Sequence, residues 1–139
     1  MDMTAMHSMS DQDRQAFMTQ IPKPSKTRFC GFMTGSRPAL DGVGLDELKL
    51  LRRAGLSQVA QGADSGSPKI LHLMNKDFQK IDTIYNAADL LSRAGIRPSF
   101  NIIFGFPGES DVERRESIRL VMNVCRQYPS AEFWTNIFT

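Results

Sequence analysis

Short apolar runs alternate along this chain with longer amphipathic stretches. Four runs are rich in aromatic or aliphatic residues, as expected for strands, and they cover 27–33, 57–62, 98–104 and 131–138. The stretches between them carry apolar residues at spacings of three and four, which is typical of amphipathic helices. Strands that alternate with helices indicate parallel strands joined by right-handed crossovers. The pattern therefore predicts an α/β fold with about four parallel strands.

Glycine marks the end of two of the predicted helices. The first helix, in "GLDELKLLRRAGL", places Leu45, Leu48 and Leu51 on one face and stops at Gly55. A longer helix over 77–95 stops at Gly95, and its predicted buried stripe consists of Ile81, Ile84, Tyr85, Ala88 and Leu91. The echo between "RRAGL" and "SRAGI" suggests repeated structural units.

Two further helices follow turns that contain serine. Ser67 is a candidate N-cap for a short helix that has Pro68 at its first position and Ile70, Leu71 and Met74 on its apolar side. The last helix is expected over 110–129, with an apolar face formed by Ile118, Val121, Met122 and Cys125.

The first 24 residues differ from the rest and are expected to form a flexible or peripheral segment. Four methionines lie in the first ten residues, which we expect to be disordered. Asp11 is a candidate cap for a short helix that ends before Pro22.

Composition narrows the functional classes. At 139 residues, with 41% hydrophobic and 23% charged residues, the chain matches one ordinary globular domain. A net charge of +2 gives no reason to expect a nucleic acid or an anionic membrane as a partner. The N-terminus lacks the charged and apolar regions of a signal peptide, so we predict a cytoplasmic location.

The two cysteines, Cys30 and Cys125, are interpreted as buried thiols. A disulfide is not expected in a reducing compartment, and free cysteine is among the most buried residue types. Together with His7 and His72 they give no metal-ligand spacing, so no metal site is predicted.

Two turns that follow predicted strands carry the candidate chemistry. Each combines glycines with polar side chains, and each leads into a helix whose first N–H groups point back toward the turn: "GADSGS" over 62–67 and "GFPGES" over 105–110. Ligands of α/β folds lie beyond the carboxyl ends of the strands, where Asp64 or Glu109 could accept hydrogen bonds from a ribose hydroxyl or an amino group. Purely structural roles are equally open: Ser67 as a cap, Glu109 and Asp111 as partners of a helix dipole, and the glycines as turn residues.

The segments "LKLLRRAGLSQVAQGADSGSPKILHLMNK" and "LLSRAGIRPSFNIIFGFPGESDVERRESI" resemble the second half of the core domain of radical S-adenosylmethionine (SAM) proteins. The group resembled most often carries a cobalamin-binding domain upstream. The resemblance covers residues 25–139 and implies consecutive βα units of a partial (βα)6 TIM-like barrel, from the third to the sixth strand.

The same resemblance implies that SAM lies against both turns and against the strand between them. The residues implied to bind this cofactor are Gly62, Asp64, Ser65, Gly66, Asn101, Ile103, Gly105, Pro107 and Glu109. Arg37 and Lys76 match positions where the family has an Arg and a Lys, and no catalytic role is assigned to either.

The sequence departs from the family pattern in three places. Asp64 stands where the family has Glu, and Ser110 stands where it has Thr. The Cys-x3-Cys-x2-Cys motif that binds the 4Fe–4S cluster is missing from these 139 residues. Fe–S clusters are held by cysteine thiolates. We therefore expect a truncated chain that lacks the cluster-binding half and generates no radical by itself, with the cluster, and in some parents a cobalamin, held by the intact protein.

Two functional hypotheses follow. The first is a fragment of a radical SAM enzyme that contributes part of the SAM-binding barrel and acts with an unknown small-molecule substrate. The alternative is a non-catalytic module that binds a nucleotide-like ligand or dimerises through exposed strand edges. A hydrolase or phosphate binder is disfavoured, because neither a Gly-x-Ser-x-Gly elbow nor a Walker A sequence occurs.

Overall fold

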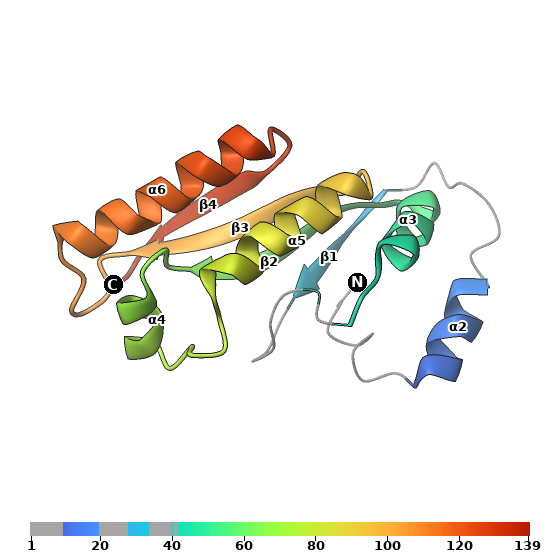
Figure 1. Ribbon diagram of the computed structural model, residues 1–139, viewed down its shortest axis with the longest axis horizontal. Coiled ribbons are helices and arrows are strands. Elements are labelled where there is room, and N and C mark those ends of the chain that lie inside the picture. The colour runs from blue at the N-terminus through green and yellow to red at the C-terminus, as the bar shows by residue number, and fades with distance from the viewer. Residues whose placement is uncertain (1–9, 20–27, 34–39, 41) are drawn as a thin grey trace.

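The fold is built on one sheet of four parallel strands (Figure 1). The computed structural model describes residues 10–19, 28–33, 40 and 42–139. In the order in which they pair, the strands are β1 (Phe29–Met33), β2 (Leu56–Asp64), β3 (Arg97–Phe104) and β4 (Glu132–Ile137). Every neighbouring pair is parallel, which confirms the predicted α/β fold.

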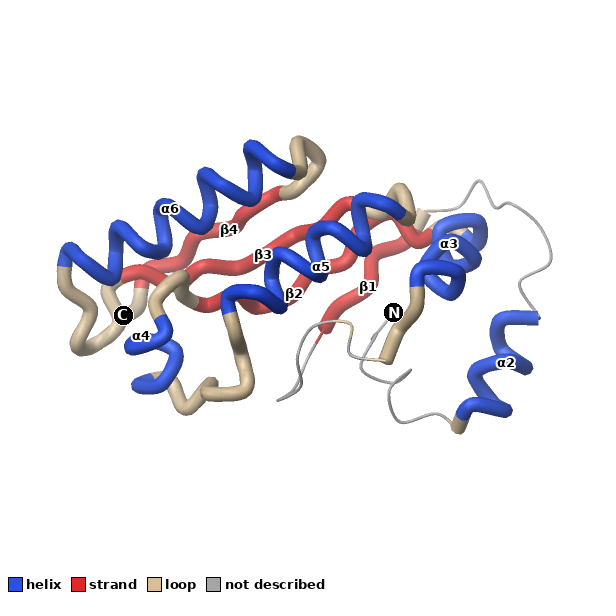
Figure 2. The backbone as a smooth tube through the Cα atoms, viewed as in Figure 1, coloured by secondary structure: helices blue, strands red, loops and turns tan. Residues whose placement is uncertain are grey.

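The long helices cover one face of the sheet (Figure 2). These helices are α3 (Leu45–Ala54), α5 (Ile81–Arg93) and α6 (Asp111–Gln127), and each connects two consecutive strands. Right-handed crossovers between strands in sequential order place all such helices on the same side. The short helix α4 (Pro68–Leu73) follows the end of β2, and α2 (Asp11–Thr19) precedes the sheet. The described helices therefore leave the opposite face of the sheet open.

The core lies between the sheet and these helices. Residues of β2 and β3 that point toward the helices are fully buried, among them Val59, Ala63, Phe100 and Ile102. The ring of Phe100 stacks on that of Phe133, with centroids 5.1 Å apart. The stripes predicted for the first and the third helix are confirmed, because their members in α3 and α5 are buried or packed against this core.

The apolar face predicted for the last helix is wrong for Ile118 and Met122, whereas Val121 packs against the core and Cys125 is half-buried. The buried residues of α6 recur at helical spacing and are Glu113, Ser117, Leu120 and Val124. Ile118 and Met122 are instead 44% and 55% exposed. The buried stripe is rotated from the predicted one because two of its members are polar and are hydrogen-bonded where they are buried.

The predicted helix ends are confirmed. Gly55 and Gly95 follow α3 and α5 with φ angles of 121° and 75°, which glycine adopts without the steric cost that other residues meet. Ser67 occupies the N-cap position of α4, but its side chain makes no capping hydrogen bond. For α2 the cap is Ser10 rather than Asp11, since Ser10 Oγ accepts a hydrogen bond from the backbone N–H of Asp13. The expected disorder of the first ten residues falls almost wholly on 1–9, outside the described residues.

The interpretation of both cysteines as buried is wrong for Cys30. Cys30 is exposed, because it pairs with Gln58 on the face of the sheet that the helices leave open. Cys125 is half-buried, and burial raises the pKa of its thiol. Within the described part of the chain, no group of three or more His, Cys, Asp or Glu side chains is arranged to hold a metal ion. None of the described helices is long and apolar enough to cross a membrane.

Candidate functional site

The two polar turns predicted to hold a ligand lie at the same end of the sheet. β2 and β3 are adjacent and parallel, and Asp64 is in register with Ile102, three residues before Gly105. The turns also meet through α4, since a β-carbon built on Gly108 would lie 2.9 Å from Cδ1 of Leu73. Both turns, α4 and the end of the chain gather at this edge, on the left in Figure 1. This edge is called the rim below.

Asp64 brings a carboxylate back from the rim over β2. Its backbone is left-handed, with φ 61°, and a register shift separates it from Gly62. A β-carbon built on Gly62 would lie 2.9 Å from Oδ2 of Asp64, so glycine at 62 permits this close approach. Lys76 Nζ donates a hydrogen bond to the same oxygen over 2.6 Å. Oδ1 accepts no hydrogen bond from the described residues and is available to another donor.

The serines of the first turn point toward α6. Ser65 Oγ and Ser117 Oγ lie 3.2 Å apart, and the N–H of Gly66 donates to Ser117 Oγ over 2.9 Å. The N–H of Ser67 donates to Ser65 Oγ over 3.1 Å. All four residues are buried. Ser65 and Gly66 therefore fasten the first turn to α6.

The second turn is closed by its own carboxylate. Oε2 of Glu109 accepts a hydrogen bond from the N–H of Gly105 over 2.6 Å, and the side chain of Glu109 is fully buried. Gly105 has φ 77° and, like Pro107, is exposed. A β-carbon built on Gly105 would meet nothing closer than Ile137 at 3.9 Å. The backbone of this turn is therefore accessible.

An ion pair that the sequence did not reveal joins α4 to α6. Lys69 Nζ donates to Oε1 of Glu113 over 2.8 Å, and Oε2 of Glu113 accepts from both the N–H and the hydroxyl of Ser110. The hydrogen bond from Lys69, followed by those from Ser110, lowers the pKa of Glu113 to about 2. The spacing Ser110–Glu113 is that of a capping box, which could have been recognised in the sequence.

The open face of the sheet carries polar and apolar side chains side by side. Side chains of a strand alternate between the two faces, so Gly62, Asn101 and Ile103 point away from the helices. Asn136 on β4 donates a hydrogen bond to Oδ1 of Asn101. The nine predicted residues therefore divide into three groups: Gly62, Asn101 and Ile103 on the open face, Asp64, Gly105 and Pro107 at the rim, and Ser65, Gly66 and Glu109 within the framework of the turns.

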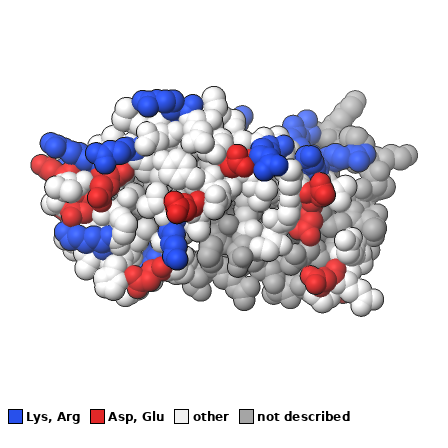
Figure 3. Space-filling view, in the orientation of Figure 1, with Lys and Arg blue, Asp and Glu red and all other residues white. Residues whose placement is uncertain are grey.

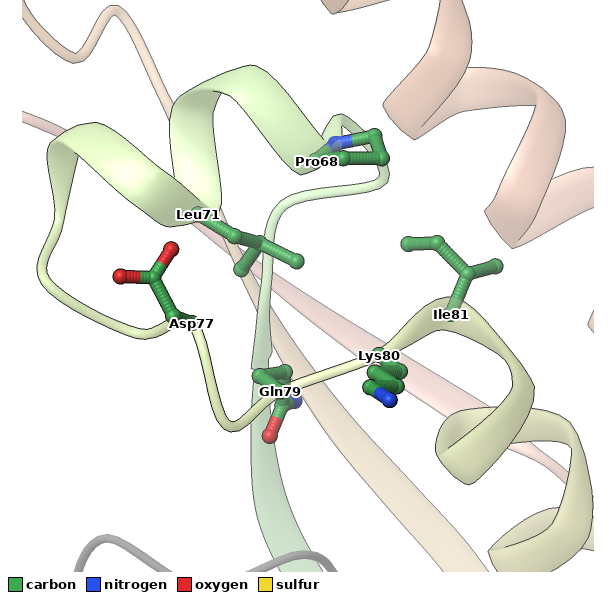
Figure 4. Close-up of a pocket in the computed structure, with 6 residues that line it drawn as sticks. All are labelled: Pro68, Leu71, Asp77, Gln79, Lys80 and Ile81. Carbon is green, nitrogen blue, oxygen red and sulfur yellow. The ribbon is translucent and has the colours of Figure 1, made fainter.

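One hollow on the helix-covered side, between α5 and α6, is lined in part by Gly66 of the first turn. Another lies between α4 and the start of α5 and is lined by the residues labelled in Figure 4: Pro68, Leu71, Asp77, Gln79, Lys80 and Ile81. None of the nine predicted residues is among them. Charges of both signs are mixed over this side of the molecule (Figure 3).

A comparison with models of protein families assigns the chain to a family. The family model described as "Radical SAM superfamily" matches residues 6–121, which is more than half of the chain. The chain belongs to the radical SAM superfamily. No curated protein sequence gives a significant match.

Solved structures of radical SAM enzymes share the fold. Coproporphyrinogen III oxidase (HemN) from Escherichia coli, described as a radical SAM enzyme, has a TM-score of 0.61 at 15% identity over 84% of this chain. The radical SAM methyltransferase TsrM from Kitasatospora setae, with tryptophan substrate and a SAM analogue bound, has a TM-score of 0.59 at 20% identity over 76% of this chain. A second TsrM structure, with cobalamin and a [4Fe–4S] cluster bound, has a TM-score of 0.56 at 15% identity over 89%. The matched regions span 19–29% of the neighbours' own chains.

The cysteines of this radical SAM chain do not fit a 4Fe–4S cluster. The sequence holds two cysteines, one fewer than the three thiolates of the family motif. Cys30 lies on β1 and its thiol faces Gln58, whereas the thiol of Cys125 donates to the carbonyl of Ala131 beyond α6. No reaction step is therefore assigned to a cluster held by these residues.

The rim does fit the polar part of SAM. Oδ1 of Asp64, a carboxylate oxygen to which no described residue donates a hydrogen bond, lies over a residue that lacks a side chain, Gly62. The left-handed turn at Gly105 exposes backbone at the same end of the sheet. Arg37, the other position that matches a family Arg or Lys, lies outside the described residues.

Proposed function

We propose that this chain forms part of the SAM-binding barrel of a radical SAM enzyme and holds the adenosyl and amino-acid portions of SAM at the rim. One observation carries the proposal: parallel pairing of β2 with β3 brings the carboxylate of Asp64 and the exposed turn at Gly105 to one edge of the sheet. Ligands of α/β folds bind at this end of the strands.

Polar and small residues on the open face support the same proposal. In a closed barrel this face lines the interior, which in many TIM barrels is a packed core of branched apolar residues. Here it carries Gly62 on β2, Asn101 on β3 and Asn136 on β4. Small and amide side chains suit a lumen that holds a ligand and water.

Each predicted residue has a proposed role. Asp64 accepts a hydrogen bond from the amino group or from a ribose hydroxyl of SAM, through the oxygen that Lys76 leaves unpaired. Gly62, Gly105 and Pro107 let the backbone approach the nucleoside closely. Along β3, Asn101 and Ile103 contact the adenine through their backbone, which leaves the side-chain amide of Asn101 to other partners.

The remaining three residues, Ser65, Gly66 and Glu109, act as positioning residues. Their hydrogen bonds to Ser117 and to the N–H of Gly105 hold the two turns in place. Substitution of these residues would therefore weaken SAM binding indirectly, by changing the conformation of the two turns.

Reductive cleavage of SAM to an adenosyl radical is proposed for an intact parent enzyme. The cluster that supplies the electron needs thiolates beyond the two cysteines of these 139 residues. A cobalamin-binding domain upstream is part of the same proposal and rests on the resemblance in sequence. The substrate and the type of radical reaction would be determined by the intact parent enzyme. The cytoplasmic location stays a prediction from the sequence.

Isothermal titration of the folded chain with SAM tests the proposal. We expect measurable binding, with affinity about tenfold lower in Asp64→Asn, because a charged acceptor is lost. Asp77→Asn is the matched control: Asp77 pairs with His72 on the exposed surface and is hydrogen-bonded to none of the predicted residues, so its variant should bind SAM like the wild type. A folded wild type that gives no binding, or equal losses in both variants, would overturn the proposal.

A dimerising module is the second candidate, and the exposed edge of the sheet favours it. β4 ends the sheet, and the side chain of Ile137 on it is 77% exposed. Unpaired strand edges promote association with another chain. Size-exclusion chromatography with light scattering would support this candidate through a discrete dimer and would oppose it through a monomer.

A further inference from the structure

Three side-chain pairs cross from β3 to β4 on the open face of the sheet. Arg97 pairs with Glu132 at 3.0 Å, Trp134 Nε1 donates to Ser99 Oγ at 3.0 Å, and Asn136 donates to Asn101 Oδ1. In the last two pairs the β4 residue leans toward the β3 residue two positions before its register partner. These six residues are called the ladder below. Its rungs change along the strands from a charged pair to an indole and then to an amide pair.

Trp134 is the unusual member of the ladder. It is 63% exposed, although a tryptophan ring gains free energy when it is covered. Its N–H is fixed by Ser99, which is itself buried. This hydrogen bond therefore fixes the orientation of the indole ring, whose exposed surface is available to a ligand.

The amide rung offers a second element of recognition. A side-chain amide carries one acceptor oxygen and an NH2 group with two donor hydrogens, so the bond between Asn101 and Asn136 leaves the NH2 group of Asn101 and the oxygen of Asn136 without a partner among the described residues. If both amides are turned together, the bond is kept and one NH2 group and one oxygen again remain. A ring that carries a donor beside an acceptor would complement this pair.

Small residues lie two strands away from Trp134 on the open face. There β2 carries Ala60 and Gly62 at the levels of Ser99 and Asn101, and the carboxylate of Asp64 lies over Gly62. Gly62 lies two strands from Trp134, about 10 Å across the sheet, so a ring on the indole and a group on Asp64 occupy separate places.

We propose that Trp134, Asn136 and Asn101 form a subsite for a flat heteroaromatic ring with neighbouring hydrogen-bond donor and acceptor groups. We assign the ring to the substrate, which would lie beside SAM. This inference therefore rests on the proposed function. Stacking on the indole supplies affinity, and the amide pair selects rings by their hydrogen-bonding edge.

Cytosine is a suitable probe, because its amino group lies beside a ring nitrogen that accepts hydrogen bonds. The chain contains one tryptophan, so a single indole N–H resonance reports on Trp134 in NMR spectra. We expect this resonance and the side-chain amide resonances of Asn101 and Asn136 to shift together on titration with cytosine. N4,N4-dimethylcytosine keeps the ring but loses the donor, and should bind more weakly.

Variants separate the two elements of the subsite. Trp134→Ala should weaken cytosine binding about fivefold or more, whereas Trp134→Phe should retain most of it. Asn136→Leu should lower the affinity for cytosine to that for N4,N4-dimethylcytosine. Asn123→Leu, on the exposed surface of α6, is the matched control and should bind cytosine like the wild type.

The outcomes distinguish this inference from the proposed function. No shift of the Trp134 resonance at millimolar cytosine, or equal binding of both cytosines, would overturn the subsite. Displacement of cytosine by SAM would also overturn it, because the ladder would then belong to the adenosyl site. Cytosine binding in a chain that does not bind SAM would contradict the proposed function but would support the subsite.

Discussion

The turns after β2 and β3 contain the same residue types but are held in place in different ways. The first turn is buried, and Ser65 and Gly66 are hydrogen-bonded to Ser117 of α6. The second turn is exposed and closes on itself through Glu109 and the N–H of Gly105. The first turn thus depends on α6, which begins 47 positions after Asp64, whereas the second is closed by a hydrogen bond within its own five residues.

The two glycines at these turns show what the difference means. A β-carbon on Gly66 would lie 2.6 Å from Cα of Ser117 and 2.7 Å from the carbonyl oxygen of Glu116. A β-carbon on Gly105 would meet only Ile137 at 3.9 Å, but its φ of 77° is unfavourable for other residues. Gly66 is required for packing, whereas Gly105 is required for backbone conformation.

The largest loss of stability is therefore expected when Gly66 is replaced by alanine. Gly66→Ala should lower the free energy of unfolding by about 3 kcal/mol, because backbone atoms of α6 must move to admit the methyl group. Gly105→Ala should cost only about 1–2 kcal/mol, the cost of a left-handed conformation. Urea unfolding followed by circular dichroism measures both. Equal losses would show that the two turns are supported alike.

The next effect concerns the serine that fastens the first turn. Ser117→Ala removes the acceptor for the N–H of Gly66 and should cost about 1–3 kcal/mol, since that buried group loses its partner. Ser92→Ala is the matched control, because the hydroxyl of Ser92 is buried without a hydrogen-bond partner. Its removal should change stability little. Thermal unfolding of the two variants compares them, and similar losses would contradict the account of the first turn.

A pH dependence is expected from the cap that follows the second turn. The pKa of Glu113 is lowered from 4.5 to about 2, so its ionised form stabilises the folded chain above pH 4.5 and this contribution is lost as the pH falls toward 2. The wild type should therefore lose stability over this range more steeply than Glu113→Gln. Urea unfolding at several pH values gives the two slopes, and parallel slopes would contradict the assigned pKa.

The sequence predicted the elements well because their signals are local. Apolar runs defined the strands, and Gly55 and Gly95 ended helices where expected. The face of α6 was misjudged because the burial of Glu113 and Ser117 depends on Lys69 and Ser65, which are distant in sequence. Hydrophobic periodicity carries no record of such partners.

The candidate site was predictable in its position and less so in its contacts. Parallel pairing of consecutive strands was enough to place both turns at one rim. The pairing of Lys76 with Asp64 could not be derived, since it depends on how the chain after α4 returns to the rim. Trp134 and Asn136 were overlooked because they lie in a strand predicted only for its apolar character.

The central claim is that both turns contribute to one cradle for an adenosyl group. NMR titration of the isotope-labelled chain with S-adenosylhomocysteine tests it most directly, because this ligand keeps the adenosyl group and carries no sulfonium charge. The account predicts that backbone amides of Gly62 and Asp64, after β2, shift together with those of Gly105 and Phe106, after β3, with one dissociation constant. Shifts confined to one turn, or two turns that respond with different constants, would contradict it.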